Sequence, residues 1–160
     1  MTSLRYLFTL MCLFSPVLSL TAQQTTRSPR LQLIPGVQYQ TVSRFTGSLQ
    51  VILEKSVRKY DEASLAHGLS IGLDAGTGGG KVLAGWANTG GIGGGSLSIG
   101  LLQTWNKPGR VAAGQTFFGP ELRGYFSALG YGVGYYWRIH GAQPGRTHTF
   151  DLSFGVWLRF

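Results

Sequence analysis

Residues 148–160 read HTFDLSFGVWLRF, and this stretch decides the predicted fold. Its large apolar residues occupy every second position, namely Phe150, Leu152, Phe154, Val156, Leu158 and Phe160. Successive side chains of a β-strand point to opposite faces of a sheet, so a period of two predicts a strand with one bulky apolar face. The last residue of the stretch is itself aromatic.

The same alternation recurs along the chain and predicts eight strands. We expect them at residues 36–43, 45–54, 63–74, 81–88, 96–105, 111–127, 130–140 and 147–160. Most of the segments between them contain clusters of Gly, Pro or Asn, which are typical of turns, and residues 55–62 (KSVRKYDE) are also predicted to form a turn. Residues 111–127 contain Gly119 and Pro120, so this segment forms either one bent strand or two short ones. No window has a helical period, and the sequence predicts an all-β protein.

The first 22 residues have the pattern of a secretory signal peptide. Arg5 precedes an apolar stretch, and small residues before Gln23 resemble a cleavage site. The single cysteine, Cys12, lies inside this segment, so the exported chain is expected to have no disulfide. Residues 23–35 are polar and contain two prolines, which predicts a lead-in segment before a barrel domain at 36–160.

The composition favours a sheet that is apolar on its outer side. Glycine makes up 25 of the 160 residues, and charged residues make up only 12 %, against about 25 % in soluble domains. The faces opposite the bulky residues carry Gly, Ser, Thr, Gln and Tyr, and large residues on all these strands would overfill a small barrel. We therefore expect the large residues to face lipid. The sheet must then close, because an open edge in hydrocarbon leaves backbone groups unpaired.

The alternation over residues 150–160, with its terminal Phe, resembles the C-terminal signal by which the barrel-assembly machinery recognises outer-membrane β-barrels. The whole chain resembles the small eight-stranded outer-membrane barrels of Gram-negative bacteria, of the outer-membrane protein X and adhesion-barrel type. This resemblance implies a closed antiparallel up-and-down transmembrane β-barrel in the outer membrane, porin-like in architecture, with no cofactor. It implies a structural or surface-binding role.

A barrel that is apolar outside places its polar faces inside. By this parity we expect a charge network in the interior, formed by Glu54, Asp74, Glu121, Arg123, Arg138, Asp151 and Arg159. Arg138 and Asp151 fall on neighbouring strands, where cross-strand ion pairs form easily. Tyr136 and Trp157 are expected to fill the lumen. Candidates for aromatic girdles at the two membrane interfaces are Trp86, Trp105, Tyr125, Phe126, Tyr135 and Trp137.

The formal net charge is +8, and the excess positive charge is expected at the barrel ends. The basic residues assigned to the ends are Arg27, Arg30, Arg44, Lys55, Arg58, Lys59, Lys81, Lys107, Arg110 and Arg146. Such ends suit the phosphates of outer-membrane lipid and lipopolysaccharide, although solvated loops would carry the same charges. An exported location makes nucleic acid a poor partner. A second candidate partner, besides lipid and lipopolysaccharide, is a protein of the cell envelope.

Two motif-like stretches lack residues that their chemistry needs. GTGGGK at 76–81 resembles a phosphate-binding loop, but Ala75 and Val82 occupy positions that require Gly and Ser or Thr. The second stretch is WRIHGAQ at 137–143. Lipid A deacylases are small barrels that use a His, a Ser two residues later and a Glu. Here Ala142 stands two residues after His140, and no Glu occurs after Glu121. His67 and His148 have no partners at metal-ligand spacing.

Three hypotheses follow. The first is a non-enzymatic outer-membrane barrel with loops of at most about eight residues. The second is a lipid-modifying or hydrolytic barrel enzyme that uses His140 with Asp151 or Ser153, which requires a hydrogen bond between them. The third is a secreted soluble barrel that binds an apolar ligand and has its bulky residues inside.

Overall fold

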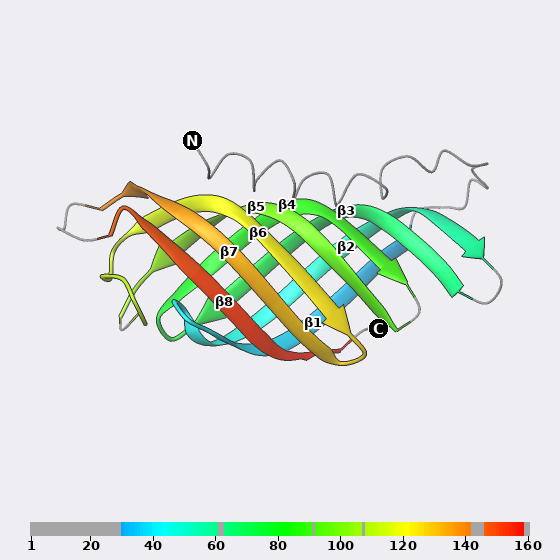
Figure 1. Ribbon diagram of the computed structural model, residues 1–160, viewed down its shortest axis with the longest axis horizontal. Helices are drawn as coiled ribbons and strands as arrows, with labels where there is room; N and C mark the ends of the chain where they lie inside the picture. The colour runs from blue at the N-terminus through cyan, green and yellow to red at the C-terminus, as the bar shows by residue number, and fades with distance from the viewer. Residues whose placement is uncertain (1–29, 61–62, 91, 107, 142–145, 159–160) are drawn as a thin grey trace, which may run out of the picture.

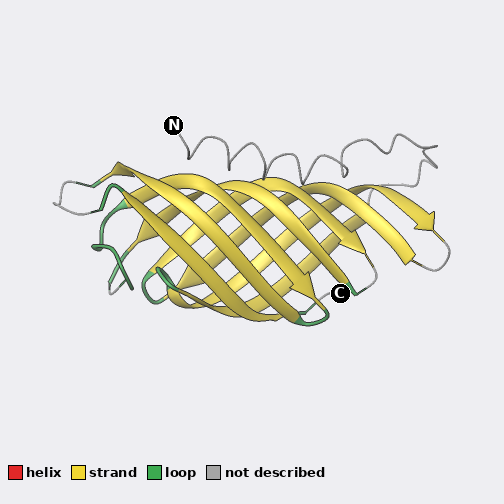
Figure 2. Ribbon diagram, in the orientation of Figure 1, coloured by secondary structure: helices red, strands yellow, loops and turns green. Residues whose placement is uncertain are grey.

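The computed structural model describes residues 30–60, 63–90, 92–106, 108–141 and 146–158, with only the backbone described at 55–60 and 63–65. Eight strands form one closed barrel in which each strand pairs antiparallel with its chain neighbour and the last pairs with the first (Figures 1 and 2). They are β1 (Arg30–Gln40), β2 (Arg44–Tyr60), β3 (Ala63–Gly76), β4 (Gly79–Gly90), β5 (Gly93–Thr104), β6 (Thr116–Phe126), β7 (Leu129–His140) and β8 (His148–Trp157). The prediction of an all-β, eight-stranded up-and-down barrel is confirmed.

The up-and-down order gives the barrel two distinct ends. The connections β1–β2, β3–β4, β5–β6 and β7–β8 lie at one end, called here the loop end. The start of β1, the end of β8 and the other three connections lie at the opposite end, called the terminal end. Within the described residues there is no helix with the length and apolarity needed to cross a membrane.

The outer wall is apolar and the lumen is polar at mid-height. Along β8, Phe150, Leu152 and Phe154 are 54 %, 50 % and 62 % exposed, whereas Asp151 and Ser153 are 1 % and 7 % exposed. The same pattern holds on the other strands, as the alternation predicts. The predicted bulky outward face is therefore present around the whole barrel.

Two apolar layers close the lumen, one near each end. The terminal-end layer consists of Ile34, Ile52, Ala87, Tyr125 and Trp157. The loop-end layer consists of Val42, Leu102, Phe117 and Tyr136, with Val111 packed against it. The expectation that Tyr136 and Trp157 fill the lumen is confirmed, whereas Tyr125 is wrong as a girdle candidate because it is buried in the terminal-end layer.

Several predicted strand boundaries are wrong. β1 begins at Arg30, so residues 30–35 belong to the sheet and not to the lead-in. Leu31 and Leu33 continue the outward apolar face of this strand. Pro35 is compatible with the sheet because it lacks only an amide donor, and its carbonyl accepts a hydrogen bond from the Leu158 amide at 2.8 Å. The predicted segments 1–22 and 23–29 lie outside the described residues.

Two other segments also differ from the prediction. β2 continues to Tyr60 through the predicted turn at 55–62, past a register shift between Glu54 and Ser56. β6 is a single strand, and its pairing with β7 is interrupted at Gly119 and Pro120, where proline supplies no donor. Residues 105–115 form the β5–β6 connection, which is longer than the predicted loops.

Phe117 and Phe118 provide a matched test of this inside-out arrangement. Phe117 is fully buried in the loop-end layer, whereas its neighbour Phe118 points outward and is 42 % exposed. We expect Phe117→Ala to lower the free energy of unfolding by about 3–5 kcal/mol, because it leaves a cavity in a packed layer. Phe118→Ala should cost much less. Urea titration of the detergent-solubilised barrel measures both, and equal losses would contradict the assignment of faces.

Candidate functional site

The centre of the lumen is organised by Lys81, which projects inward from the start of β4. Its Nζ atom lies 2.6 Å from a Glu121 carboxylate oxygen, 2.9 Å from Asp151 and 3.6 Å from Asp74. These carboxylates come from β6, β8 and β3, so one ammonium group bridges three other strands. All four side chains are at most 1 % exposed.

Arg123 is the second buried cation and extends the network toward the terminal end. Its Nε atom lies 2.6 Å from Glu121, and its Nη atoms donate to both carboxylate oxygens of Asp74. The guanidinium carbon also lies 5.4 Å from the centre of the Trp157 ring, within the range of a cation–π contact. Arg123 therefore joins the central charges to the terminal-end apolar layer.

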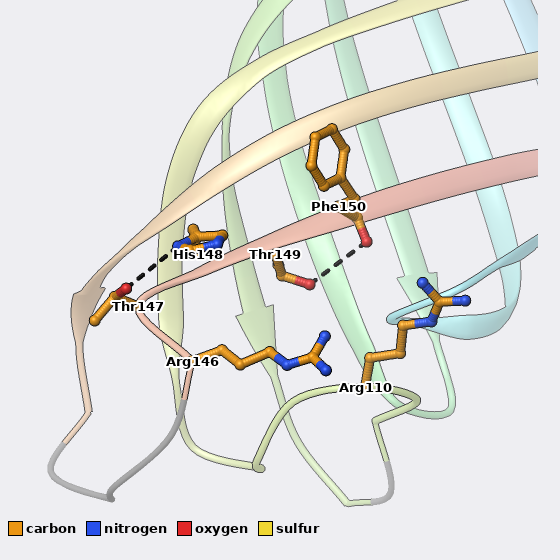
Figure 3. A pocket seen from close by; sticks show the side chains of 6 residues that line it. All are labelled: Arg110, Arg146, Thr147, His148, Thr149 and Phe150. Carbon is orange, nitrogen blue, oxygen red and sulfur yellow. Dashed lines mark hydrogen bonds between the residues drawn. The ribbon is translucent and has the colours of Figure 1, made fainter.

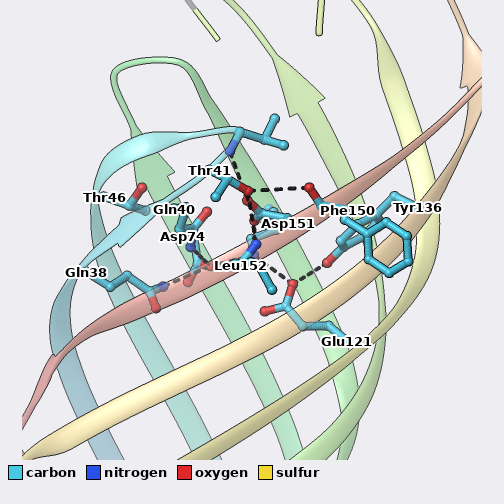
Figure 4. A network of polar contacts seen from close by, with 12 residues as sticks. Gln38, Gln40, Thr41, Thr46, Asp74, Glu121, Tyr136, Phe150, Asp151 and Leu152 are labelled. Atoms are coloured by element: carbon cyan, nitrogen blue, oxygen red, sulfur yellow. Dashed lines mark hydrogen bonds and ion pairs between the residues drawn. The ribbon is translucent and has the colours of Figure 1, made fainter. Parts of the chain in front are cut away.

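Within this network three carboxylates face two cations. Neutral donors satisfy the carboxylates further (Figure 4). Asp74 accepts hydrogen bonds from Ser48, Gln38 and Gln40 at 2.5, 3.2 and 2.8 Å. The hydroxyl of Tyr136 donates to Glu121 and so links the network to the loop-end layer. A buried charge is tolerated only when partners of this kind replace its lost hydration.

Asp151 also helps to close the barrel. The β1–β8 seam has five paired positions, between residues 36–40 and 153–157, fewer than the other strand pairs. Just beyond the seam, Asp151 Oδ1 accepts hydrogen bonds from the Val42 amide at 2.9 Å and the Thr41 hydroxyl at 3.0 Å. Since its other oxygen contacts Lys81, Asp151 couples the closing seam to the centre of the lumen.

The structure brings together four of the seven residues predicted for the interior network, namely Asp74, Glu121, Arg123 and Asp151. Glu54 lies apart toward the terminal end, half-buried, where the Thr89 hydroxyl donates to it at 3.2 Å. Arg159 lies outside the described residues, as does Phe160 of the predicted insertion signal.

The predicted Arg138–Asp151 pair does not form. Asp151 lies opposite Gly134 of β7, and Arg138 is four residues further toward the loop end, half-buried at the mouth of the lumen. The antiparallel register separates the two residues, and the cation that Asp151 contacts is Lys81 instead.

The assignment of Lys81 to a barrel end is wrong. The glycines before Lys81 indicated a loop, but the connection from Gly76 to Gly79 is a two-residue turn and β4 begins before the lysine. In this tight hairpin Lys81 lies directly opposite Asp74. Counting back from a two-residue turn would have predicted this pair from the sequence. The position of Lys81 also excludes the phosphate-loop interpretation of residues 76–81, because its side chain points into the lumen.

A second polar feature is a pocket of about 410 Å³ at the loop end (Figure 3). This loop-end pocket is lined by Arg110, Arg146, Thr147, His148, Thr149 and Phe150. Arg110 comes from the β5–β6 connection, and the other five come from the beginning of β8 and the residues before it. Figure 3 shows the side chains of Arg110, Arg146 and Thr149 directed into the space beneath β8. Both arginines were expected at the barrel ends, but the sequence did not predict that they share a pocket.

His140 lies exposed at the end of β7. The acids and hydroxyls that the enzyme hypothesis pairs with it, Asp151 and Ser153, are buried in the lumen, and Asp151 is held by Lys81, Thr41 and Val42. Among the described residues the arrangement that this hypothesis requires is therefore not assembled.

Comparisons with protein families, with curated proteins and with solved structures give no match for this chain.

The central network predicts a specific stability effect. We expect Lys81→Met to lower the free energy of unfolding by about 3–5 kcal/mol, because it leaves buried carboxylates without their shared cation. Adding Asp151→Asn should recover part of the loss, since the amide oxygen can still accept the seam hydrogen bonds without a charge. Urea unfolding of the single and double variants in detergent measures this coupling. Strictly additive losses would show that Lys81 and Asp151 do not act together.

Proposed function

We propose that this protein is an integral outer-membrane β-barrel with a filled lumen, which acts as a structural or surface-binding element of the envelope. The observation that carries the proposal is the outward apolar wall on all eight strands. Among the described residues, thirty large hydrophobic side chains are exposed, whereas the charged cluster is buried. A soluble protein of this size rarely exposes a continuous apolar surface, and a closed barrel leaves no unpaired strand edge in lipid.

The lumen supports a structural role over transport. The terminal-end layer, the central ion network and the loop-end layer occupy it in succession, and contacts of Arg123 with Trp157 and of Tyr136 with Glu121 join them. Eight-stranded barrels have interiors just wide enough to be filled by side chains. Interaction with other molecules is therefore assigned to the loop end.

The soluble alternative needs large residues in the lumen to bind an apolar ligand. The buried residues between the two apolar layers are instead mainly Gln, Ser and charged side chains. This distribution favours the membrane hypothesis. The sequence pattern of residues 1–22 and the alternation at 150–158 also support export to the outer membrane.

Gel mobility of boiled and unboiled protein extracted from the outer-membrane fraction in detergent tests the proposal. A mobility shift is expected, because a closed barrel stays folded in detergent until it is heated. Protein in the soluble fraction without a shift would contradict it.

Arginine substitutions on β4 separate a membrane barrel from a soluble one. Ala84 and Asn88 both point outward, but Ala84 pairs with Ile71 and Ile99 in the middle of the apolar wall, whereas Asn88 lies closer to the terminal end. In lipid vesicles, Ala84→Arg should cost about 2–4 kcal/mol of folding free energy, and Asn88→Arg about 0–1 kcal/mol. Folding titrations in urea measure both. Ala84→Arg would be close to neutral if water surrounded this wall.

A further inference from the structure

The loop end carries an unbalanced positive charge. Its described basic residues include Arg44, Arg110 and Arg146. The chain has only six acidic residues. Three of these, Asp74, Glu121 and Asp151, are buried in the central network, and Glu54 lies on β2 near the terminal end. None of these four described acids falls in a loop-end connection.

The two arginines of the loop-end pocket stand on anchored backbone. Arg110 follows Gly109, whose amide donates to the Val42 carbonyl at 2.9 Å. The same connection is tied to β5 because the Thr104 hydroxyl donates to the Ala112 carbonyl at 2.8 Å. On the other side of the pocket, the Arg138 amide donates to the Thr147 carbonyl at 2.8 Å, immediately after Arg146. The pocket is thus formed before any ligand arrives, which lowers the ordering cost of binding.

We infer that the loop-end pocket binds a phosphate group. Arg110 and Arg146 are both exposed, and their planar guanidinium groups match the paired oxygens of a phosphate. Thr147, His148 and Thr149 supply further polar groups around the same space. A phosphate would neutralise the charge of these two arginines, which no described carboxylate in the loop-end connections balances.

The surroundings of the pocket favour a phosphate carried by a lipid. Phe150 lines the pocket and is 54 % exposed on the outer wall, where it packs edge-on against Tyr135 at 4.7 Å between ring centres. Trp137, 49 % exposed, stands next to Tyr135. Aromatic groups of this kind lie at the interface between headgroups and acyl chains. A headgroup phosphate in the pocket would let its acyl chains run along the apolar wall below. This inference rests on the proposed membrane location.

The test uses the full barrel in a nonionic detergent and native mass spectrometry to measure bound molecules. Dioctanoyl phosphatidic acid carries the phosphate and the chains, dioctanoylglycerol carries the chains alone, and inorganic phosphate carries the anion alone. We expect phosphatidic acid to bind and dioctanoylglycerol to bind much more weakly. Arg110→Gln/Arg146→Gln should weaken phosphatidic acid binding at least about tenfold, since it removes charge-assisted hydrogen bonds. Arg30→Gln, which removes one exposed charge at the terminal end, is the control and should bind normally.

The outcomes separate the sources of phosphate and the two proposals. If inorganic phosphate competes with the lipid at similar concentration, the phosphate site stands and its natural ligand is a free phosphate. Equal binding of dioctanoylglycerol, or of the double variant and wild type, would overturn the inference. Each variant is first checked for the heat-dependent mobility shift. A shift without phosphate binding rejects only the pocket, whereas no shift in the wild type rejects the membrane barrel itself.

Discussion

Lys81 holds three buried carboxylates from three different strands, and the rest of the lumen is arranged around it. Asp74 lies opposite it on β3, while Glu121 and Asp151 reach it from across the barrel. The acids Asp74 and Glu121 also contact Arg123. Because Lys81 and Arg123 together leave one of the three negative charges uncompensated, neutral donors complete the network. Through Asp151 the same cluster reaches the short β1–β8 seam. Closure of the sheet and filling of the lumen thus depend on one connected set of contacts.

The polarity of the two faces explains why this network is placed inside. Exposed and buried residues alternate along β5 and β8, and most inward residues at mid-height are small or polar. Larger inward residues such as Leu102 and Trp157 belong to the two apolar layers. In the proposed membrane location lipid would cover the apolar side chains, which leaves hydrogen bonds and ion pairs to specify the packing of the centre. The two apolar layers shield these polar contacts from solvent at both ends and strengthen them by lowering the local dielectric.

Charge is also divided along the barrel axis. The carboxylates at mid-height are paired with buried partners. In the described connections of the loop end, every charged residue is basic. The filled lumen supports the proposed structural role more than passage along the barrel axis. The exposed arginines beside an aromatic outer edge instead give the loop end a chemistry suited to phosphate groups at a membrane surface.

The sequence by itself determined the alternation, the number of strands and the side of the sheet on which most residues of a strand lie, because these are local properties that repeat every two residues. It therefore identified Asp74, Glu121, Arg123 and Asp151 as inward. The tertiary structure decided which of them meet: register around a closed barrel separates Arg138 from Asp151 and brings Lys81, which was expected at a barrel end, into the centre. It also decided that residues 30–35 join the sheet and that Arg110 and Arg146 share a pocket. Such neighbours are far apart in the chain, and only the stagger of the closed sheet brings them together.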